Sequence, residues 1–478
     1  MVAGRVVIAA PASGSGKTVV ATGLMAALRR AGHRVAPAKV GPDYIDPGYH
    51  TLASGRPGRN LDPVLVGEDL VGSLFAHGAA GADLTVVEGV MGLFDGRVGG
   101  AGFGSTAHVA GLLGAPVVLV VDTRGHGSSL AALLHGFRTW RPEVRLAGVI
   151  LNQVGSDRHE SVLREACAEV GLEVYGVLRR HAEVAVPSRH LGLVTAAEHG
   201  PAALRAVDAM ADLVAGGVDL AAIVHLAQSA TGNLAAPWDP DVPSVAAGPV
   251  VAVAGGSAFT FGYAEHTELL RAAGAEVVVF DPLRDNALPE GTAGIVVPGG
   301  FPEQHAAELS ANVGLRTAVA DAVAAGVPVQ AECAGLLYLA RTLDGVPMCG
   351  VLGVDATMTD RLVLGYRDVV ATVDSVLHTA GTRTVGHEFH RTVTTPAHGE
   401  PPAWTWRGPG GTVRSDGFVT GATHASYVHT HPAATPAAVA RFVARCAARS
   451  SSTANATPIV AHNTTCVPSE ASRNSQSV

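Results

Sequence analysis

Two short stretches of this sequence carry residue types whose spacing could do chemistry. The first is Val6–Thr18, VVIAAPASGSGKT, in which an apolar run leads through a glycine-rich turn into Lys17 and Thr18. A strand, a glycine-rich turn and a helix in this order form a phosphate-binding loop. In such a loop Lys17 would contact the β- and γ-phosphates, and the Thr18 hydroxyl would bind Mg²⁺. The candidate nucleotide ligands within the turn are Ser13, Gly14 and Gly16.

The match to the phosphate-loop pattern is incomplete, because the pattern begins with a glycine where this chain has Pro11. The alternative is a tight strand-to-helix turn that binds nothing. The sequence SGSGKT directly after an apolar strand is rare by accident, however. We therefore predict a nucleotide site at this turn.

Lys39 ends a second apolar strand and precedes a Pro- and Gly-rich loop, Val40–Gly48, which contains Asp43 and Asp46. In an open parallel sheet, ligands bind at the carboxyl ends of the strands. Lys39, Asp43 and Asp46 are therefore candidate contacts for nucleotide or substrate. The alternative is an ordinary loop in which Asp and Pro form turns.

Two further strand ends carry candidate ligands. Glu88 ends the apolar strand 83–88 and could hold Mg²⁺ directly or through water. Asp95, in the loop that follows, would either support this metal or form a turn. Asn152 ends the strand 146–152, where its amide could bind the edge of a base.

The second chemical stretch surrounds Cys333, which lies between an apolar strand (327–332) and a predicted helix (334–343). A sharp turn at this position would present the thiol as a nucleophile, and the helix N-terminus would favour its thiolate. His429 and His431 are candidate bases, and the Gly299-Gly300 turn could donate N–H groups to an oxyanion. The alternative is a buried structural cysteine.

Composition limits the partners of the chain. Its 478 residues carry a net charge of −8, which disfavours nucleic acid and a membrane surface as partners. The five cysteines are widely spaced and include no CxxC pair, which is typical of a reducing cytoplasm. The longest apolar run, near 109–121, is too short for a bilayer, and the sequence shows no signal peptide. We therefore expect a cytoplasmic protein.

The order of the predicted elements indicates the fold. Strands alternate with helices in both halves of the chain, which predicts two doubly wound α/β domains, 1–224 and 248–447. Residues 225–247 break the pattern as a linker, and 448–478 are predicted to be a disordered tail. The predicted elements are strands at 6–10, 34–39, 83–88, 117–122, 146–152, 250–254, 276–280, 294–297 and 327–332, short strands within 387–390 and 426–431, and helices at 17–30, 265–273 and 438–447.

Further motifs resemble two known families. The motifs VPGGFPE (297–303), ECAGLLYL (332–339), GHEFH (386–390) and SYVHTH (426–431) resemble class I glutamine amidotransferase domains of the cobalamin-biosynthesis branch. The first half resembles the dethiobiotin-synthetase-like ATP domain of the cobyrinic or hydrogenobyrinic acid a,c-diamide synthase family. That resemblance rests on ASGSGKT (12–18), KVGPDYIDP (39–47), VVEGVMGLFDG (86–96) and PSRHLGLV (187–194).

The resemblance implies an ATP-dependent ligase in cobalamin biosynthesis. Such an enzyme amidates the a and c carboxylates of a corrinoid acid through an acyl phosphate, with Mg²⁺ as cofactor and ammonia taken from glutamine. It implies Cys333 as nucleophile, with His429 as the base and His431 as the alternative. The remaining implied contacts are Ser13, Gly14, Gly16, Lys17, Thr18, Lys39 and Asn152 for ATP, Thr18, Asp46 and Glu88 for Mg²⁺, and Asp43, Tyr44 and Asp46 for the corrinoid acid. A homodimer is a further expectation.

One position departs from the family pattern. Class I amidotransferases usually place a Glu two residues after the catalytic His, whereas positions 431 and 433 are His and Ala here. The group that orients the base is therefore open. Two rival functions also stay open, a cobyric acid synthase that amidates other corrinoid carboxylates and a partition-type ATPase. The sequence does not settle whether the corrinoid ring contains cobalt.

Overall fold

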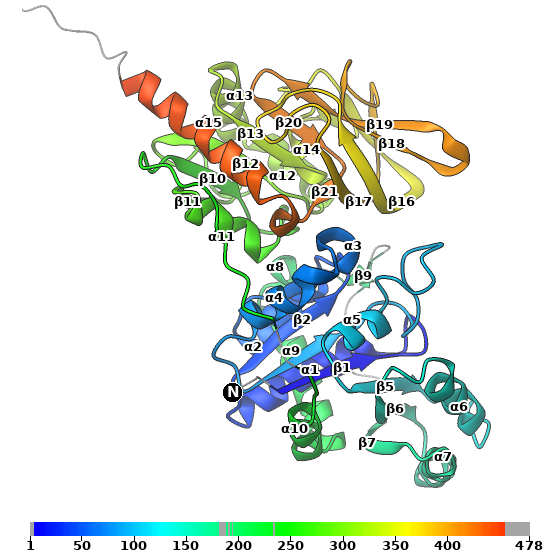
Figure 1. Cartoon of the computed structure of the whole chain (residues 1–478). Helices are drawn as coiled ribbons and strands as arrows, with labels where there is room; N and C mark the ends of the chain where they lie inside the picture. The colour runs from blue at the N-terminus through cyan, green and yellow to red at the C-terminus, as the bar shows by residue number, and fades with distance from the viewer. Residues whose placement is uncertain (1–3, 181–187, 190–191, 194, 233–234, 455–478) are drawn as a thin grey trace, which may run out of the picture.

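The structure is a computed structural model and describes residues 4–180, 188–189, 192–193, 195–232 and 235–454. These residues form two α/β domains, one above the other in Figure 1. The first contains a seven-stranded parallel sheet flanked by helices, and the second contains a twelve-stranded mixed sheet. The predicted fold class is confirmed.

The first domain alternates strands and helices. Its strands are β1 (Gly4–Ala9), β2 (Val35–Val40), β3 (Arg59–Leu61), β4 (Leu84–Glu88), β5 (Val117–Asp122), β6 (Leu146–Val154) and β7 (Glu173–Arg179), with a separate pair β8 (Ser188–Arg189) and β9 (Gly192–Leu193). Its helices are α1 (Lys17–Arg30), α2 (Asp46–Ser54), α3 (Pro63–Val66), α4 (Glu68–Gly78), α5 (Thr106–Leu112), α6 (Leu130–Trp140), α7 (Asp157–Glu169), α8 (Ala196–His199), α9 (Pro201–Gly217) and α10 (Leu220–Gln228).

The strand order of the first sheet is β3-β2-β4-β1-β5-β6-β7. Every residue of β1 is buried, as expected for a central parallel strand covered by helices on both faces. β1 pairs with β4 on one side and β5 on the other. The loop after β1 therefore opens at the middle of the carboxyl edge, where ligands bind in open parallel sheets.

The second domain begins as a parallel sheet and continues as an antiparallel one. Its strands are β10 (Val250–Ala254), β11 (Glu276–Phe280), β12 (Thr292–Val297), β13 (Val329–Glu332), β14 (Thr342–Leu343), β15 (Val346–Pro347), β16 (Asp355–Ala371), β17 (Arg383–Thr395), β18 (Pro402–Arg407), β19 (Val413–Thr420), β20 (Thr423–Ser426) and β21 (His429–Thr430). Its helices are α11 (Ala264–Ala272), η1 (Pro302–His305), α12 (Ala306–Ala311), α13 (Val313–Ala324), α14 (Ala334–Leu339), η2 (Pro409–Gly411), η3 (Pro432–Ala434) and α15 (Pro436–Ala454). Among the helices that the structure describes, none combines the length and the apolar character that crossing a membrane requires.

Two long strands replace the short strand predicted at 387–390. β16 and β17 pair antiparallel from Asp355↔Thr395 to Val370↔Arg383, with one irregularity. Apolar side chains of this pair, such as Leu364 and Val393, are exposed. The alternation of apolar and polar residues that identifies a strand in a sequence is therefore weak here.

Several boundaries differ from the prediction. α14 ends at Leu339 rather than at position 343. α10 continues to Gln228, inside the predicted linker, because Ile223, Leu226 and Ala227 are buried against the first domain. α15 continues to Ala454, so the first part of the predicted tail is helical; Ala and Arg directly after position 447 favour helix. Residues 455–478, and positions 187, 190–191 and 194 of PSRHLGLV, lie outside the described residues.

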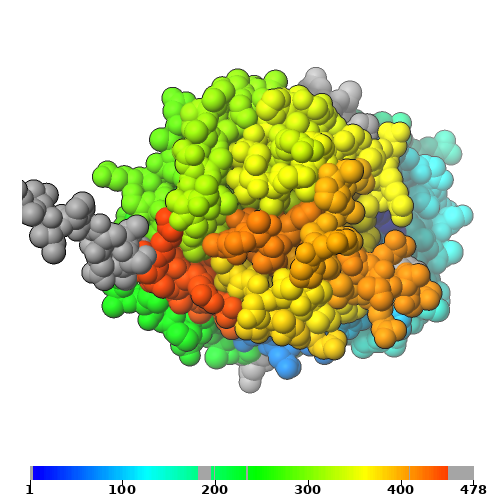
Figure 2. Space-filling view, turned by 90° about the horizontal axis from the view of Figure 1, so that it is seen from above, coloured from blue at the N-terminus to red at the C-terminus, as the bar shows by residue number. Residues whose placement is uncertain are grey.

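The two domains meet through a buried ion-pair cluster. Arg59, at the start of β3, lies 2.7 Å from Glu265 and 2.5 Å from Glu268 of the second domain. Phe261, Tyr263 and Phe301 of the second domain pack into the hydrophobic core of the first. Viewed from above, the second domain covers most of the first, whose cyan part remains visible at the right rim (Figure 2).

Removing the arginine of this cluster should loosen the whole chain. Arg59→Ala leaves Glu265, a fully buried carboxylate, without its cation, and losing one partner of a buried pair costs about 3–5 kcal/mol of unfolding free energy. The matched control is Arg30→Ala, whose pairs with Asp208 and Asp212 are exposed and are worth less than about 1 kcal/mol. Urea unfolding measures both variants, and equal losses would contradict the structural role of Arg59.

Candidate active site

The phosphate loop has the geometry of a turn built to approach a ligand closely. Gly14 and Gly16 have φ values of 80° and 96°, which glycine adopts without steric cost. The Ser15 hydroxyl closes the turn by donating to the carbonyl oxygen of Ala12 at 2.9 Å. Positions 12–14, which include the predicted ligands Ser13 and Gly14, are exposed, so the loop presents its tip outward.

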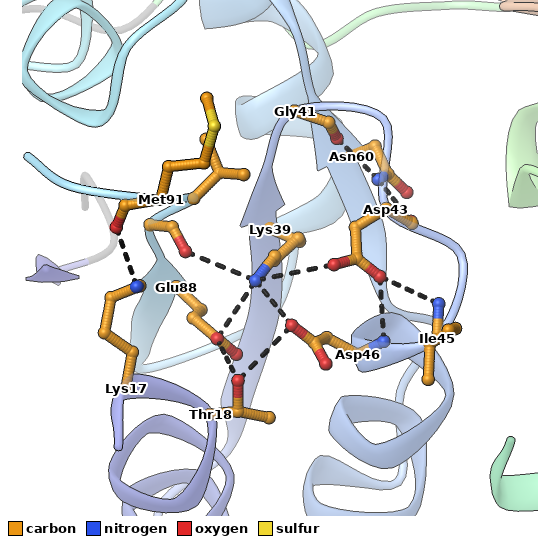
Figure 3. Close-up of polar contacts among 12 residues, drawn as sticks. Lys17, Thr18, Lys39, Gly41, Asp43, Ile45, Asp46, Asn60, Glu88 and Met91 are labelled. Atoms are coloured by element: carbon orange, nitrogen blue, oxygen red, sulfur yellow. Dashed lines mark hydrogen bonds and ion pairs between the residues drawn. The ribbon is translucent and has the colours of Figure 1, made fainter. Parts of the chain in front are cut away.

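Lys17 is buried at the base of this loop, and its Nζ donates to the carbonyl oxygen of Met91 at 2.7 Å (Figure 3). Burial, followed by the charge of Lys39, lowers the pKa of Lys17. Two ammonium groups held near each other in a buried site attract anions. The contact of Lys17 with phosphate stays a prediction.

Asn152 braces the loop in this structure. Its Nδ2 donates to the carbonyl oxygen of Ser15 at 3.0 Å, and its Oδ1 accepts from the N–H of Gln153 at 2.9 Å. A side chain at Gly16 would collide with it, since an added Cβ would lie 2.4 Å from Nδ2. Both ends of the amide thus have partners within the protein, whereas a contact with the base of a nucleotide stays a prediction.

Lys39 lies at the centre of a buried charge cluster, which we call the phosphate centre: Lys39, Asp43, Asp46 and Glu88, with Thr18 beside them (Figure 3). Lys39 Nζ lies 2.5 Å from Asp46 Oδ2, 3.0 Å from Glu88 Oε1 and 3.7 Å from Asp43 Oδ2. Lys39 and Glu88 are register partners on β2 and β4, and Asp46 begins α2. The carboxyl ends of two strands and one helix N-terminus therefore converge on one ammonium.

The charges of the phosphate centre shift one another's ionisation. Burial opposes the charge of Lys39, but Asp46, Glu88 and Asp43 raise its pKa above the ordinary value. Burial also opposes ionisation of Glu88, yet Lys39 and a hydrogen bond with His50 lower its pKa. Burial, then the neighbouring Asp43, raise the pKa of Asp46. Lys39 thus faces three carboxyl groups, and Lys17 is a second ammonium group near Glu88 and Asp46.

The three predicted metal ligands lie together. The Thr18 hydroxyl donates to Glu88 Oε1 at 2.6 Å and lies 3.4 Å from Asp46 Oδ2. Hydroxyl and carboxylate oxygens are the ligands that Mg²⁺ prefers, usually together with water and substrate phosphates. Thr18, Asp46 and Glu88 could therefore hold Mg²⁺ beside a nucleotide bound in the loop.

Two polar residues of this site were not predicted from the sequence. His50 is fully buried on α2, one turn after Asp46, and its Nε2 lies 2.6 Å from Glu88 Oε2. Asn60 Nδ2 donates to the carbonyl oxygens of Gly41 and Asp43, both at 2.7 Å. His50 thus orients the predicted metal ligand, and Asn60 fixes the loop that carries Asp43. Asp95, the other acidic candidate, accepts from the N–H of Gly92 and forms a turn.

The thiol centre, by which we mean Cys333, His429 and the Gly299-Gly300 turn, lies in the second domain. Cys333 joins β13 to α14 with φ 50° and ψ −99°, a strained conformation for a residue other than glycine. Gly335 allows the turn to pack closely, since a Cβ there would lie 2.1 Å from the carbonyl oxygen of Val297. This is the geometry predicted for a nucleophile at a strand-to-helix elbow.

The start of α14 favours the Cys333 thiolate as expected, through the backbone N–H of Ala334, but opposing effects are larger. Burial raises the pKa of the Cys333 thiol, and the negative charges of Glu303 and Glu332 add to this effect. These contributions outweigh the dipole of α14, which has six residues. The thiol therefore needs a base to take its proton.

His429 lies against the Gly299-Gly300 turn. A Cβ at Gly299 would lie 2.5 Å from His429 Cε1, and a Cβ at Gly300 would lie 2.0 Å from the carbonyl oxygen of Ala258. Only glycine therefore fits at either position. The imidazole is fully buried, and its Nδ1 lies 3.4 Å from Glu332 Oε2. This placement supports His429 as the base, and the oxyanion role of the two glycines stays a prediction.

His431 is held differently. Its Nδ1 accepts from the N–H of Ala433 at 3.2 Å, and its ring packs on Tyr263 with centroids 4.2 Å apart. Burial lowers its pKa to about 4. His431 thus packs against the domain interface, where Glu265 and Arg59 are its charged neighbours.

Tyr44 connects the two centres. It lies in the loop between Asp43 and Asp46, yet its ring packs in the second domain against Phe261, stacked at 5.2 Å, and against His429 at 5.1 Å. It is also 5.5 Å from His387, whose ring stacks on His429. The contact of Tyr44 with substrate stays a prediction, and the loop that carries Tyr44 reaches both centres.

Comparisons with known proteins agree with this division. Residues 6–194 match the CobQ/CobB/MinD/ParA nucleotide binding domain, and residues 250–437 match the CobB/CobQ-like glutamine amidotransferase domain. A hydrogenobyrinate a,c-diamide synthase of Mycobacterium tuberculosis strain H37Rv is 62% identical over 438 residues, which cover 90% of this chain and 95% of the relative. One of Streptomyces coelicolor is 59% identical, with the same coverage. A cobyrinate a,c-diamide synthase of Synechococcus is 40% identical over 90% of this chain and 95% of the relative.

A nucleotide-binding domain followed by a glutamine amidotransferase domain defines a glutamine-dependent amide ligase. The chain belongs to the a,c-diamide synthase family of such ligases.

Replacing Glu88 should weaken metal binding. Glu88→Gln keeps the shape of the side chain but removes the charge that Thr18, Lys39 and His50 contact. We expect a higher Mg²⁺ requirement and a fall in ATP-dependent amidation on the order of 10²-fold, because a fixed charge beside the phosphates is lost. Asp95→Asn is the control, and a Mg²⁺ titration of the rate measures both. An unchanged Mg²⁺ requirement in Glu88→Gln would place the ligand elsewhere.

Proposed function

We propose that this chain amidates the a and c carboxylates of hydrogenobyrinate, a ring without cobalt, using ATP, Mg²⁺ and ammonia from glutamine. The carrying observation is the identity of 54–62% with relatives named hydrogenobyrinate a,c-diamide synthases, against 40–43% with those named for cobyrinate. The joint presence of the phosphate centre and the thiol centre supports the same reaction. A partition-type ATPase would have no use for the thiol centre.

Activation of the carboxylate comes first. A carboxylate oxygen of the corrinoid acid attacks the γ-phosphorus of ATP, the bond to the ADP oxygen breaks, and an acyl phosphate forms. Lys17 and Lys39 neutralise charge on the phosphates, and the loop N–H groups bind their oxygens. Mg²⁺, held by Thr18, Glu88 and Asp46, would supply charge neutralisation at the phosphate oxygens. Ammonia then attacks the acyl carbon, phosphate leaves, and one proton is released.

Ammonia is produced at the thiol centre. His429 takes the proton of Cys333, the sulfur attacks the amide carbon of glutamine, and the proton passes to the leaving ammonia. N–H groups of the Gly299-Gly300 turn would stabilise the oxyanion. Water then hydrolyses the thioester to glutamate and restores the thiol. Two rounds, one at each carboxylate, give the diamide.

The proposal extends to the surroundings of the chain. A reducing cytoplasm suits the buried cysteines Cys167, Cys333, Cys349 and Cys446. The net charge of −8 disfavours nucleic acid as a partner. A homodimer is part of the proposal, and sedimentation of the purified chain measures it.

Substrate comparison tests the choice of ring. We expect the purified protein to convert hydrogenobyrinate to its a,c-diamide with a kcat/KM at least about tenfold above that for cobyrinate. A tenfold ratio corresponds to roughly 1.4 kcal/mol of discrimination between the two substrates. Mass spectrometry of the products measures both reactions. A higher kcat/KM for cobyrinate would reverse the assignment, and amidation of other side chains alone would favour the cobyric acid synthase alternative.

The thiol centre should be separable from the phosphate centre. Cys333→Ala should lose glutamine-dependent amidation but keep ATP-dependent amidation when free ammonia is supplied at high concentration, because the thiol takes no part in carboxylate activation. His429→Ala should behave likewise, and His431→Ala should lose less. Lys17→Ala is the opposite control and should lose amidation with either nitrogen source. Full glutamine-dependent activity in Cys333→Ala would reject the nucleophile.

A further inference from the structure

The base of the thiol centre lacks a carboxylate at the usual place. Position 431 is His and position 433 is Ala, and the structure directs His431 toward Tyr263 and the domain interface. An imidazole that takes a proton is normally held and stabilised by a carboxylate at its other nitrogen. The chain must supply this group from elsewhere or work without it.

We propose that Glu332, the residue directly before the nucleophile, is the positioning carboxylate of His429. Its Oε2 lies 3.4 Å from His429 Nδ1. Both side chains are largely buried, with exposed fractions of 16% for Glu332 and 1% for His429. The inference rests on the proposed roles of Cys333 and His429 and adds the third member of their site.

The topology explains how neighbours in space arise from distant parts of the chain. β13 pairs in parallel with β20, and Glu332 lies opposite Ser426. The chain turns directly after Ser426 and reaches His429 in β21 three residues later. The N–H of Cys333 also donates to the carbonyl oxygen of Ser426 at 2.8 Å. One strand pair therefore fixes the nucleophile, the carboxylate and the base together.

The other carboxylate oxygen of Glu332, Oε1, has its own hydrogen-bond partner. Gln330 Nε2 donates to Glu332 Oε1 at 3.3 Å. Gln330, Glu332 and His266 line a cavity of about 30 Å³, which is room for one water molecule. The Gln330 side chain also interacts with His266. Glu332 Oε1 therefore has Gln330 as its partner, while Oε2 faces the imidazole of His429.

Charge favours the same role. Glu332 acts electrostatically on Tyr44, Tyr263, His266, Cys333 and His378, and the carboxylates of Glu303 and Asp416 act on the same thiol. Burial lowers the pKa of both histidines and raises the pKa of the tyrosines and the thiol, so all five are neutral near pH 7. The carboxylate of Glu332 beside Nδ1 would stabilise the imidazolium formed when Nε2 takes the thiol proton.

The distance of 3.4 Å is longer than a good hydrogen bond, and both ring nitrogens of His429 are without a hydrogen bond in the described structure. Catalytic hydrogen bonds are often long in the free enzyme and shorten when substrate binds. The imidazole becomes positively charged when it takes the proton of Cys333, and this charge attracts the carboxylate of Glu332 to Nδ1.

The test is the glutaminase reaction of Glu332→Gln, which keeps the size of the side chain and removes its charge. We expect kcat to fall on the order of 10²- to 10⁴-fold with little change in KM for glutamine, because the group acts on the proton transfer and not on binding. The acidic limb of the pH profile should move to lower pH, since loss of a neighbouring negative charge lowers the pKa of the base. A purely structural role would not move this limb.

Two controls make the result decisive. Glu276→Gln makes the same substitution at an exposed position of β11 and should match the unmodified chain. ATP-dependent amidation with added ammonia reports whether Glu332→Gln is folded. A folded Glu332→Gln protein with the kcat and pH profile of the unmodified chain would overturn the proposal.

Should Glu332→Gln fail to fold, Glu332→Asp gives the test instead. It keeps the charge one methylene further from the ring, so we expect the original acidic limb with a kcat reduced on the order of tenfold. The proposal would be overturned if the acidic limb of the pH profile of Glu332→Asp moved to lower pH by as much as removal of the charge predicts. Failure of the thiol centre itself is distinguished by Cys333→Ala, because glutaminase activity in that variant would remove the proposed nucleophile whatever Glu332 does.

Discussion

The buried ammonium of Lys39 constrains the arrangement of the first domain. An isolated buried cation is costly, and here it is compensated by carboxylates from two further elements, β4 and the start of α2. These partners fix the carboxyl ends of adjacent strands and the start of one helix relative to each other. Thr18, in the first turn of α1, joins this cluster because its hydroxyl donates a hydrogen bond to Glu88. The charged side chains beside the phosphate loop are therefore already positioned without a bound nucleotide.

The two centres differ in electrostatic character. The phosphate centre concentrates charge, as the binding of a polyphosphate and the transfer of its terminal group require. The interior around the thiol centre contains His378, His387, His424 and His431, and burial lowers the pKa of each of them. Neutral imidazoles suit a site that must release an uncharged amine. The two centres differ because buried charged side chains surround the first and buried neutral imidazoles surround the second.

Much of this could be predicted from the sequence, because strong local signals were involved. The loop around Lys17, the acidic strand tip at Glu88 and the elbow at Cys333 each come at the end of a strand that the sequence predicts. The roles of these residues stay predictions. The strands β5, β10 and β11 have the predicted boundaries. Their apolar runs are continuous, as in the buried strands of parallel sheets.

The missed residues depend on tertiary geometry. His50 was overlooked because Val40–Gly48 reads as a loop, although Asp46 and Pro47 begin α2; Pro in a first turn was the available signal. The contact of Glu332 with His429 spans two strands and has no local signature. The full length of β16 and β17 was not predicted, because exposed apolar residues weaken the alternation of apolar and polar residues in these strands.

The aromatic residues around Tyr44 bear on whether each domain could exist as a separate protein. Phe261, Tyr263 and Phe301 pack into the core of the first domain although the second domain carries them. A fragment that starts after the linker would present these rings together as an apolar patch, and such patches promote association. The amidotransferase half expressed alone is thus expected to self-associate, and supplying the first domain in trans should keep it dispersed. Because both domains belong to one chain, this apolar surface stays covered.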